Sequence, residues 1–154
     1  MDAQLIRNRI EGLGFSAKTT YGLLALLELA GVQASGERLQ VGEIATRQSI
    51  PERYLEQMMS ALRRAGMVRS VRGARGGYLL ARAAGEISLS EVISCLEGEA
   101  NRPAANEGSS ELQVINSFAN ELSVQRDARL RRTTLADLLA ERDARIANQA
   151  MYFI

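Results

Sequence analysis

The stretch that decides the fold is "SIPERYLEQMMSALRRAGMVRSVRGARGGYLLAR", residues 49–82. Its first half predicts an amphipathic helix, because apolar residues recur at intervals of three and four. These residues are Leu55, Met58, Met59 and Leu62. Ser49 and Glu52 have the spacing of a capping box, and Pro51 lies in the first turn, where its missing N–H costs nothing. The helix is therefore expected to begin near Pro51.

Two further helices are expected upstream of this stretch. Val41, Ile44 and Ala45 fit one face of a short helix that ends a few residues before Pro51, and two helices joined by so short a turn predict a helix-turn-helix. Residues 16–30, "SAKTTYGLLALLELA", are apolar almost all round. They predict a central helix, capped by Ser16 and closed at 31 by glycine.

The second half of the stretch predicts a β-hairpin. Two short apolar runs, 67–71 and 78–80, flank the glycine-rich turn 73–77. A hairpin that directly follows a helix-turn-helix is the order of a winged helix. The predicted fold class is therefore mainly α with a small β-hairpin wing, a winged helix-turn-helix domain followed by a long dimerisation helix.

Positive charge gathers in this part of the chain. Residues 47–82 hold eight arginines and two acidic residues, whereas the whole chain of 154 residues has a net charge of +1. Arginine can bond guanine, glutamine can bond adenine, and a carboxylate can accept from cytosine. A solvated polar face is the alternative, but the basic hairpin beside it favours double-stranded DNA. The predicted DNA-binding residues are Arg53, Tyr54, Glu56, Gln57, Ser60, Arg64, Arg72 and Arg75.

The C-terminal half predicts helices outside the winged helix. Ser88 and Glu91 have capping-box spacing and begin one helix, and Thr134 with Asp137 begins a last short one that runs to Ile146. Between them a long helix is expected from residue 111 to 133. Its apolar stripe needs cover, and a homodimer partner is favoured over packing on the same chain. The predicted dimerisation residues are Leu112, Ile115, Phe118, Ala119 and Leu122.

These patterns divide the chain into five parts. We expect an N-terminal extension at 1–14, the winged-helix DNA-binding domain at 15–98, a loop at 99–110, dimerisation helices at 111–145 and a C-terminal tail at 146–154. No apolar run is long enough to cross a bilayer, and residues 1–14 do not resemble a signal peptide. The expected location is therefore cytoplasmic, without a membrane partner.

Composition argues against catalysis. One cysteine excludes an internal disulfide, and the absence of histidine excludes the usual zinc, haem and nucleophile–histidine sites. No catalytic residue, metal ligand or cofactor is expected, and the protein is not expected to be an enzyme. Cys95 lies one helical step from an apolar face and is interpreted as a small buried hydrophobe rather than a redox sensor.

Four motifs together resemble the Rrf-type winged-helix regulators between about residues 15 and 139. They are "YGLLALLELA", "YLEQ" followed by "VRGARGGYLLAR", "ISLSEVISCLEG" and "TTLADLL". The resemblance implies a homodimer crossed through the long helix, with each winged helix on half of a palindrome. It also implies base contacts from Glu56 and Gln57, groove or backbone contacts from Arg53 and Tyr54, and insertion of Arg72 into the minor groove.

Two features narrow this resemblance. Many family members bind an iron–sulfur cluster through three cysteines after the fourth helix, but "EANRPAANEGSS" has none, so a cluster is not expected. The ending "AMYFI" is similar to that of the cluster-free CymR-type repressors of cysteine metabolism, which implies O-acetylserine thiol-lyase as a partner. A terminal isoleucine carboxylate can imitate an amino-acid substrate. The predicted partner-binding residues are therefore Tyr152, Phe153 and Ile154.

Alternatives remain at this point. The tail can instead fold back to complete the dimer core. The protein can be a global regulator of the same family that senses redox state or a small ligand, or a protein-interaction module that does not bind DNA.

Overall fold

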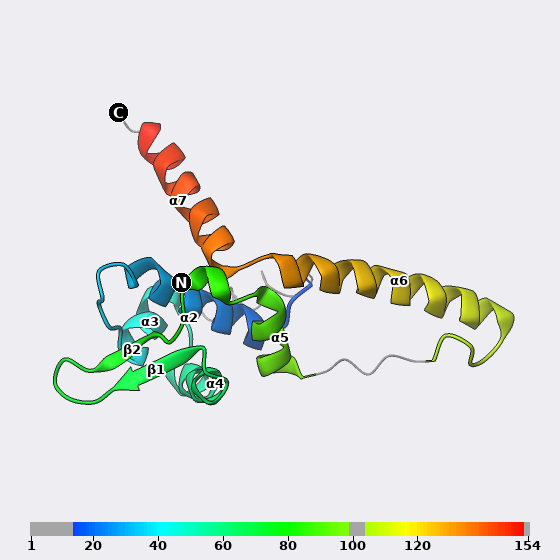
Figure 1. Cartoon of the computed structure of the whole chain (residues 1–154), viewed down its shortest axis with the longest axis horizontal. Helices are drawn as coiled ribbons and strands as arrows, with labels where there is room; N and C mark the ends of the chain where they lie inside the picture. Colours follow the sequence, from blue (N-terminus) through cyan, green and yellow to red (C-terminus); the bar gives the residue numbers. More distant parts are fainter. Residues whose placement is uncertain (1–13, 99–103, 153–154) are drawn as a thin grey trace.

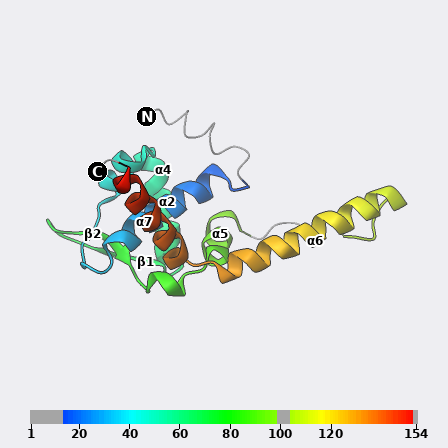
Figure 2. The same ribbon diagram turned by 90° about the horizontal axis from the view of Figure 1, so that it is seen from above.

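The computed structural model describes residues 14–98 and 104–152. Its elements are α2 (Ala17–Val32), α3 (Val41–Gln48), α4 (Glu52–Arg64), β1 (Val68–Val71), β2 (Gly77–Leu80), the 3₁₀ helix η1 (Ala84–Glu86), α5 (Leu89–Glu97), α6 (Ser110–Arg132) and α7 (Leu135–Met151). Figures 1 and 2 show a body formed by α2–α5 and the hairpin, from which α6 extends as a long arm. No helix of the described residues is long and apolar enough to cross a membrane.

Helix α2 is the centre of the body, as its nearly uniform apolar composition predicts. It contacts α3, α4, α5, α7 and β2, and Leu26 and Leu29 are completely buried. The Ser16 hydroxyl caps the helix by accepting from the Thr19 amide. The helix was expected to end at residue 30, before Gly31, but α2 continues two residues further, to Val32. Gly31 instead makes room for α7, because a Cβ there would lie 2.8 Å from the Arg142 guanidinium.

Helices α3 and α4 form the predicted helix-turn-helix, but the turn is built differently from the expected one. Ser49 ends α3 in a left-handed conformation, with φ of 54°, and its side chain does not cap α4. The predicted capping box with Glu52 is therefore wrong. The amide of buried Ile50 donates to the Ala45 carbonyl at 2.9 Å, so the backbone of the turn caps the end of α3. Helix α4 begins after Pro51 without a side-chain cap.

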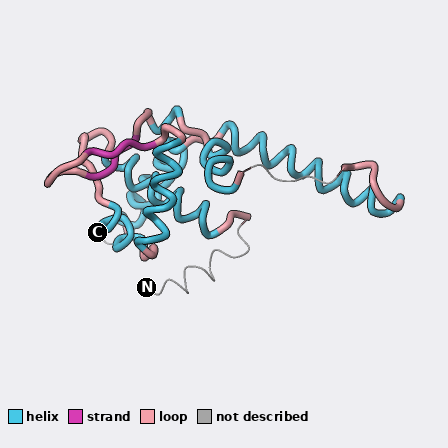
Figure 3. Tube along the Cα trace, turned by 90° about the horizontal axis from the view of Figure 1, so that it is seen from below, coloured by secondary structure: helices cyan, strands magenta, loops and turns pink. Residues whose placement is uncertain are grey.

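The wing is the predicted antiparallel hairpin, drawn in magenta in Figure 3. Val68 pairs with Leu80, and both are buried against the body. A third segment that the sequence did not reveal joins the hairpin at Leu39, which exchanges two backbone hydrogen bonds with Tyr78. Gly77 permits this approach, because a Cβ there would lie 2.8 Å from the Leu39 carbonyl oxygen. The winged-helix fold class is confirmed.

The junction of α6 with α7 is attached to the body by backbone bonds. The Leu89 amide donates to the Thr133 carbonyl at 2.9 Å, and the Leu135 amide donates to Ile87 at 3.0 Å. The predicted capping box of Thr134 and Asp137 is present. Helix α6 ends at residue 132, one residue before the expected end at 133. Helix α7 continues five residues beyond its expected end and leaves the body on the side away from α4 (Figure 1).

Candidate nucleic-acid interface

The buried apolar stripe of α4 determines which face of the helix points outward. Its predicted apolar stripe, Leu55, Met58, Met59 and Leu62, is at most 1% exposed. Because this stripe cannot rotate away from the core, the residues half a turn away must point to solvent. Arg53, Glu56 and Gln57 are all exposed there. None of their side chains has a hydrogen-bond or ion-pair partner within the described residues.

The remaining predicted residues of α4 are placed less uniformly. The Tyr54 side chain is 58% exposed at the edge of the same face. Ser60 is half-buried, and Arg64 is exposed in the last turn. Arg64 also lies close enough to α5 for its charge to act on the Cys95 thiol. The first turns of α4 therefore present the most accessible polar groups.

The wing places its two predicted arginines in the loop between β1 and β2. Arg72 and Arg75 are both exposed. The loop closes through a hydrogen bond of 2.9 Å from the Gly76 amide to the Gly73 carbonyl. Gly76 is required, because a Cβ there would lie 2.3 Å from the Val71 carbonyl oxygen. The wing and α4 lie on the same side of the body in Figure 1.

Three other arginines lie on α4, on β1 and just before α3, and they were not predicted to contribute. Arg69 is exposed on β1, and Arg63 links α4 to β1 by donating to the Ser70 hydroxyl at 3.4 Å. Arg38 reaches the wing from the segment before α3. The first two belong to the basic stretch and were visible in the charge count. The place of Arg38 depends on the pairing of Leu39 with the hairpin, which no local pattern reveals.

Cys95 is packed as a small apolar residue. Its side chain is half-buried against the core, and its thiol donates to the Ala61 carbonyl at 3.5 Å. Burial raises the pKa of the Cys95 thiol, although the positive charges of Arg64 and Lys18 oppose the shift. The thiolate, which is the reactive and metal-binding form, is therefore disfavoured.

The arm carries a long uncovered apolar stripe. The exposed fractions of Leu112, Ile115, Phe118 and Leu122 lie between 45% and 64%, and Ala119 is exposed between them. All five predicted dimerisation residues lie on one side of α6, because their spacing follows the helical repeat. Nothing in the described part of this chain covers them.

Comparison with known proteins identifies the family. Residues 15–141 match the family described as Rrf2, iron-dependent transcriptional regulator. The chain belongs to the Rrf2 family. The regulator IscR of Cereibacter sphaeroides is 44% identical over 96 residues, which are 62% of each chain. CymR of Bacillus subtilis is 42% identical over 83 residues, 54% of this chain and 59% of that one. The chain thus spans about three fifths of the length of these curated relatives.

Solved structures agree with this assignment. T. potens IscR superimposes with a TM-score of 0.71 at 37% identity, covering 85% of this chain and 89% of that one. CymR, described as the global cysteine regulator of B. subtilis, gives 0.68 at 32% identity, covering 82% and 96%. The curated relatives are named as transcriptional regulators rather than enzymes. The predicted family is confirmed, with IscR and CymR similarly close.

The iron implied by the family description does not fit the donor set of this chain. The sequence has one cysteine and no histidine. Within residues 14–98 and 104–152, no group of three or more histidine, cysteine, aspartate or glutamate side chains could hold a metal ion. Iron–sulfur clusters need about four thiolate or imidazole ligands, and the single thiol is bonded to a backbone carbonyl.

Proposed function

We propose that this regulator is a dimer that binds palindromic double-stranded DNA, with α4 in the major groove and the wing against the neighbouring backbone and minor groove. The observation that carries the proposal is the polar face of α4, where Arg53, Glu56 and Gln57 are exposed and have no side-chain partner among the described residues, together with the exposed wing arginines Arg72 and Arg75. When the polar side chains of a recognition helix have no partners in the free protein, all of them can form hydrogen bonds with base edges.

Glu56 supports base reading rather than simple attraction to phosphates. A carboxylate among arginines weakens nonspecific binding, because it repels the DNA backbone. The same group gains a hydrogen bond where a cytosine amino group faces it. Glu56 therefore makes sense on a surface that selects sequence, with Arg53 and Gln57 beside it.

The α6 stripe supports a two-fold dimer. Burial of apolar area on a partner's identical stripe gives a self-complementary contact, as a closed dimer requires. Two copies would then present two α4 helices to one duplex. For binding on one side of B-DNA, their half-sites should be about 34 Å apart, one helical turn.

The DNA-binding proposal is tested by selecting bound duplexes from a random library and measuring their affinity at several salt concentrations. A palindromic consensus, and affinity that falls steeply with salt, are expected. A protein-interaction module would select no consensus. Recovery of only nonspecific binding would reject the sequence-reading role of α4.

We also propose that the protein represses genes of cysteine or sulfur metabolism together with O-acetylserine thiol-lyase, through Tyr152, Phe153 and Ile154. Tyr152 is 90% exposed at the end of α7, and Met151 is 72% exposed. These side chains are available to a partner rather than packed on their own core, while Phe153 and Ile154 lie outside the described residues. The similarity to CymR supports the choice of pathway.

Calorimetry with the purified thiol-lyase tests this partner. Removal of Ile154 should abolish binding without changing the dimer, and amidation of its carboxylate should weaken binding because the amide loses the negative charge. Added O-acetylserine should compete for the same site. Equal affinity of all forms would reject binding through the terminal isoleucine, and a large loss of thermal stability on its removal would favour a tail that folds back on the dimer core.

A further inference from the structure

The wing is held to the helix-turn-helix by the segment that leads into α3. Leu39 is completely buried and donates to the Tyr78 carbonyl at 3.0 Å, while the Tyr78 amide donates back at 2.7 Å. Residue 41 already begins α3. The end of β2 nearest the loop is therefore hydrogen-bonded to the segment that begins the first helix of the helix-turn-helix.

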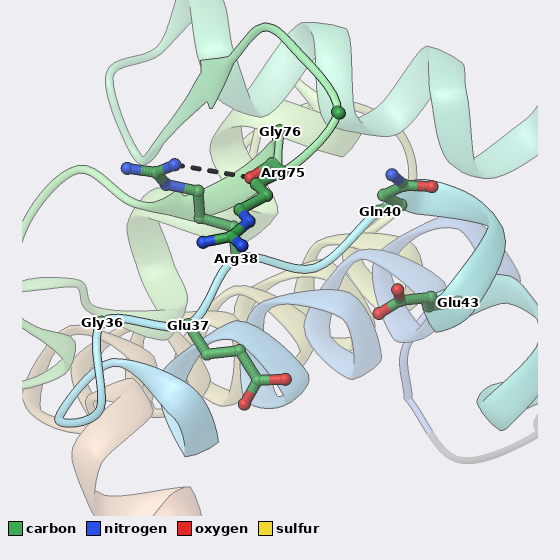
Figure 4. Close-up of a pocket in the computed structure, with 8 residues that line it drawn as sticks. Gly36, Glu37, Arg38, Gln40, Glu43, Arg75 and Gly76 are labelled. Atoms are coloured by element: carbon green, nitrogen blue, oxygen red, sulfur yellow. Dashed lines mark hydrogen bonds between the residues drawn. The ribbon is translucent and has the colours of Figure 1, made fainter.

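The tip of the wing extends beyond this pairing and has little support. Among the described residues, one hydrogen bond reaches the tip loop, residues 72–76, from outside the hairpin. In that bond the Arg38 guanidinium donates to the Arg75 carbonyl at 3.4 Å (Figure 4). Below the bond an open notch of about 340 Å³ separates the tip from the start of α3, so side-chain packing does not fix the tip there.

The notch does not have the charge of an anion site. Arg38 and Arg75 line it, but so do Glu37 and Glu43, and the four charges cancel. Figure 4 shows that these side chains come from the segment before α3, from the wing and from α3 itself. Attraction of a phosphate into the notch is therefore weak. The role of Arg38 is better inferred from its hydrogen bond to the wing tip.

We infer that Arg38 is a positioning residue for DNA binding, which holds the wing tip so that Arg72 and Arg75 meet the duplex at a fixed offset from α4. This inference rests on the proposed DNA-binding function. A tip that is already ordered loses less conformational entropy when its arginines bind. Arg38 acts through the backbone of Arg75 and not through its own contact with DNA.

A double-mutant design tests this role with a duplex taken from the selection experiment. Arg38→Ala is made in the wild type and in an R72A/R75A background, which keeps the backbone carbonyl that Arg38 bonds. In the wild type we expect a loss of affinity of about three- to tenfold, the net value of one hydrogen bond. In the background without wing side chains, we expect a change smaller than about twofold, because no side chain remains to be positioned.

The matched control is Arg145→Ala on α7, which removes the same charge far from the wing. Arg145 forms an ion pair with Glu141 within its own helix. Its replacement should change affinity less than about twofold, since exposed i,i+4 pairs contribute little. Amide exchange of Gly76 in the free protein supplies a second readout, and it should accelerate in R38A but not in R145A.

Four outcomes would overturn the inference. Equal losses in both backgrounds would make Arg38 an independent DNA contact, and an unchanged affinity or unchanged Gly76 exchange in R38A would remove its role at the tip. If the wild-type protein binds no duplex, the proposed function fails and the inference fails with it. If the wild type binds and the losses are additive, only the inference fails.

Discussion

Apolar residues are buried in the body of this protein but exposed in its arm. In the body, the apolar faces of α2, α4 and α5 meet one another, and residues such as Leu26 and Leu55 are completely buried. In the arm, Phe118 and Ile115 are more than 60% exposed. Figure 1 shows why, since most of α6 extends away from every other helix.

The difference shows which parts of the structure one chain completes alone. The body gains its stability from contacts within the chain, so that stability should not depend on protein concentration. The arm exposes a stripe of large apolar side chains to water, and the described part of one chain has no element that buries this stripe. The stability and function of the arm should therefore depend on concentration and partner.

The largest effect is expected from a charge placed in the arm stripe. Leu122→Glu should convert the dimer to a monomer, because burial of an unpaired carboxylate in an apolar interface is unfavourable. Affinity for a palindromic duplex should fall by about 100-fold or more, since two linked half-site contacts become one. Sedimentation velocity and DNA titration measure the two effects.

Val124→Glu is the matched control for that variant. Val124 is also exposed, at 56%, but lies two residues from Leu122 and hence nearly on the opposite side of α6. It should leave both dimerisation and DNA binding unchanged. A monomeric wild-type protein, or equal effects of the two variants, would show that the stripe is not the interface.

The next effect concerns the body. Leu29→Ala should lower the free energy of unfolding by about 2–5 kcal/mol. The Leu29 side chain is completely buried, so its removal leaves a cavity in the core. Chemical denaturation measures this loss, which should be the same at low and high protein concentration in the Leu122→Glu background. A loss that varies with concentration there would mean that the body also depends on a partner.

The body was largely predictable from sequence, because its signals are local. The stripe from Leu55 to Leu62 predicts both the buried side of α4 and, by helical geometry, the opposite exposed side. The hairpin and the capping residues Ser16, Ser88 and Thr134 follow from short spacings in the same way. The polar face of the candidate site was therefore placed correctly, while its binding to DNA remains a proposal.

Features that depend on distant contacts could not be predicted. Ser49 has a capping residue's chemistry, but the tight turn after α3 requires a left-handed residue at that position. Gly31 signals a helix end, yet it is retained inside α2 because Arg142 approaches there. The contact of Arg38 with the wing arises only after Leu39 pairs with the hairpin. At Gly31 and Arg38 a partner far away in sequence decides the outcome, whereas at Ser49 the backbone bonds of the turn to Ala45 decide it.

A smaller effect is expected at the surface of the body. Glu56→Ala should relax sequence preference at one base pair of each half-site by about 1–3 kcal/mol, the value of one base-edge contact. Total affinity should fall less, because the removed carboxylate also repels phosphates. The preference is measured by competition between duplexes that differ at single positions. An unchanged consensus would remove Glu56 from the recognition surface, and unchanged dimerisation would confirm that this face and the arm act separately.

The smallest effect is expected at Glu97, where the body meets the arm. Its carboxylate accepts from the Thr19 hydroxyl at 2.8 Å and from the Ser16 amide at 3.2 Å. Partial burial alone would raise the pKa of Glu97, but these hydrogen bonds outweigh burial and hold the pKa below its ordinary value, helped by Arg126 of α6. Thr19 is completely buried, so loss of this acceptor leaves its hydroxyl without a strong partner.

A lowered folded-state pKa means that ionised Glu97 stabilises the folded chain. That contribution is fully present above the pKa of the unfolded state and is lost as pH falls through the lower pKa of the folded state. Glu97→Gln should therefore be less stable than the wild type near neutral pH, by a small amount because the residue is exposed. The difference should shrink on acidification, as denaturation midpoints between about pH 3 and pH 7 would measure. A constant difference across this range would mean that folding does not favour the ionised form of Glu97.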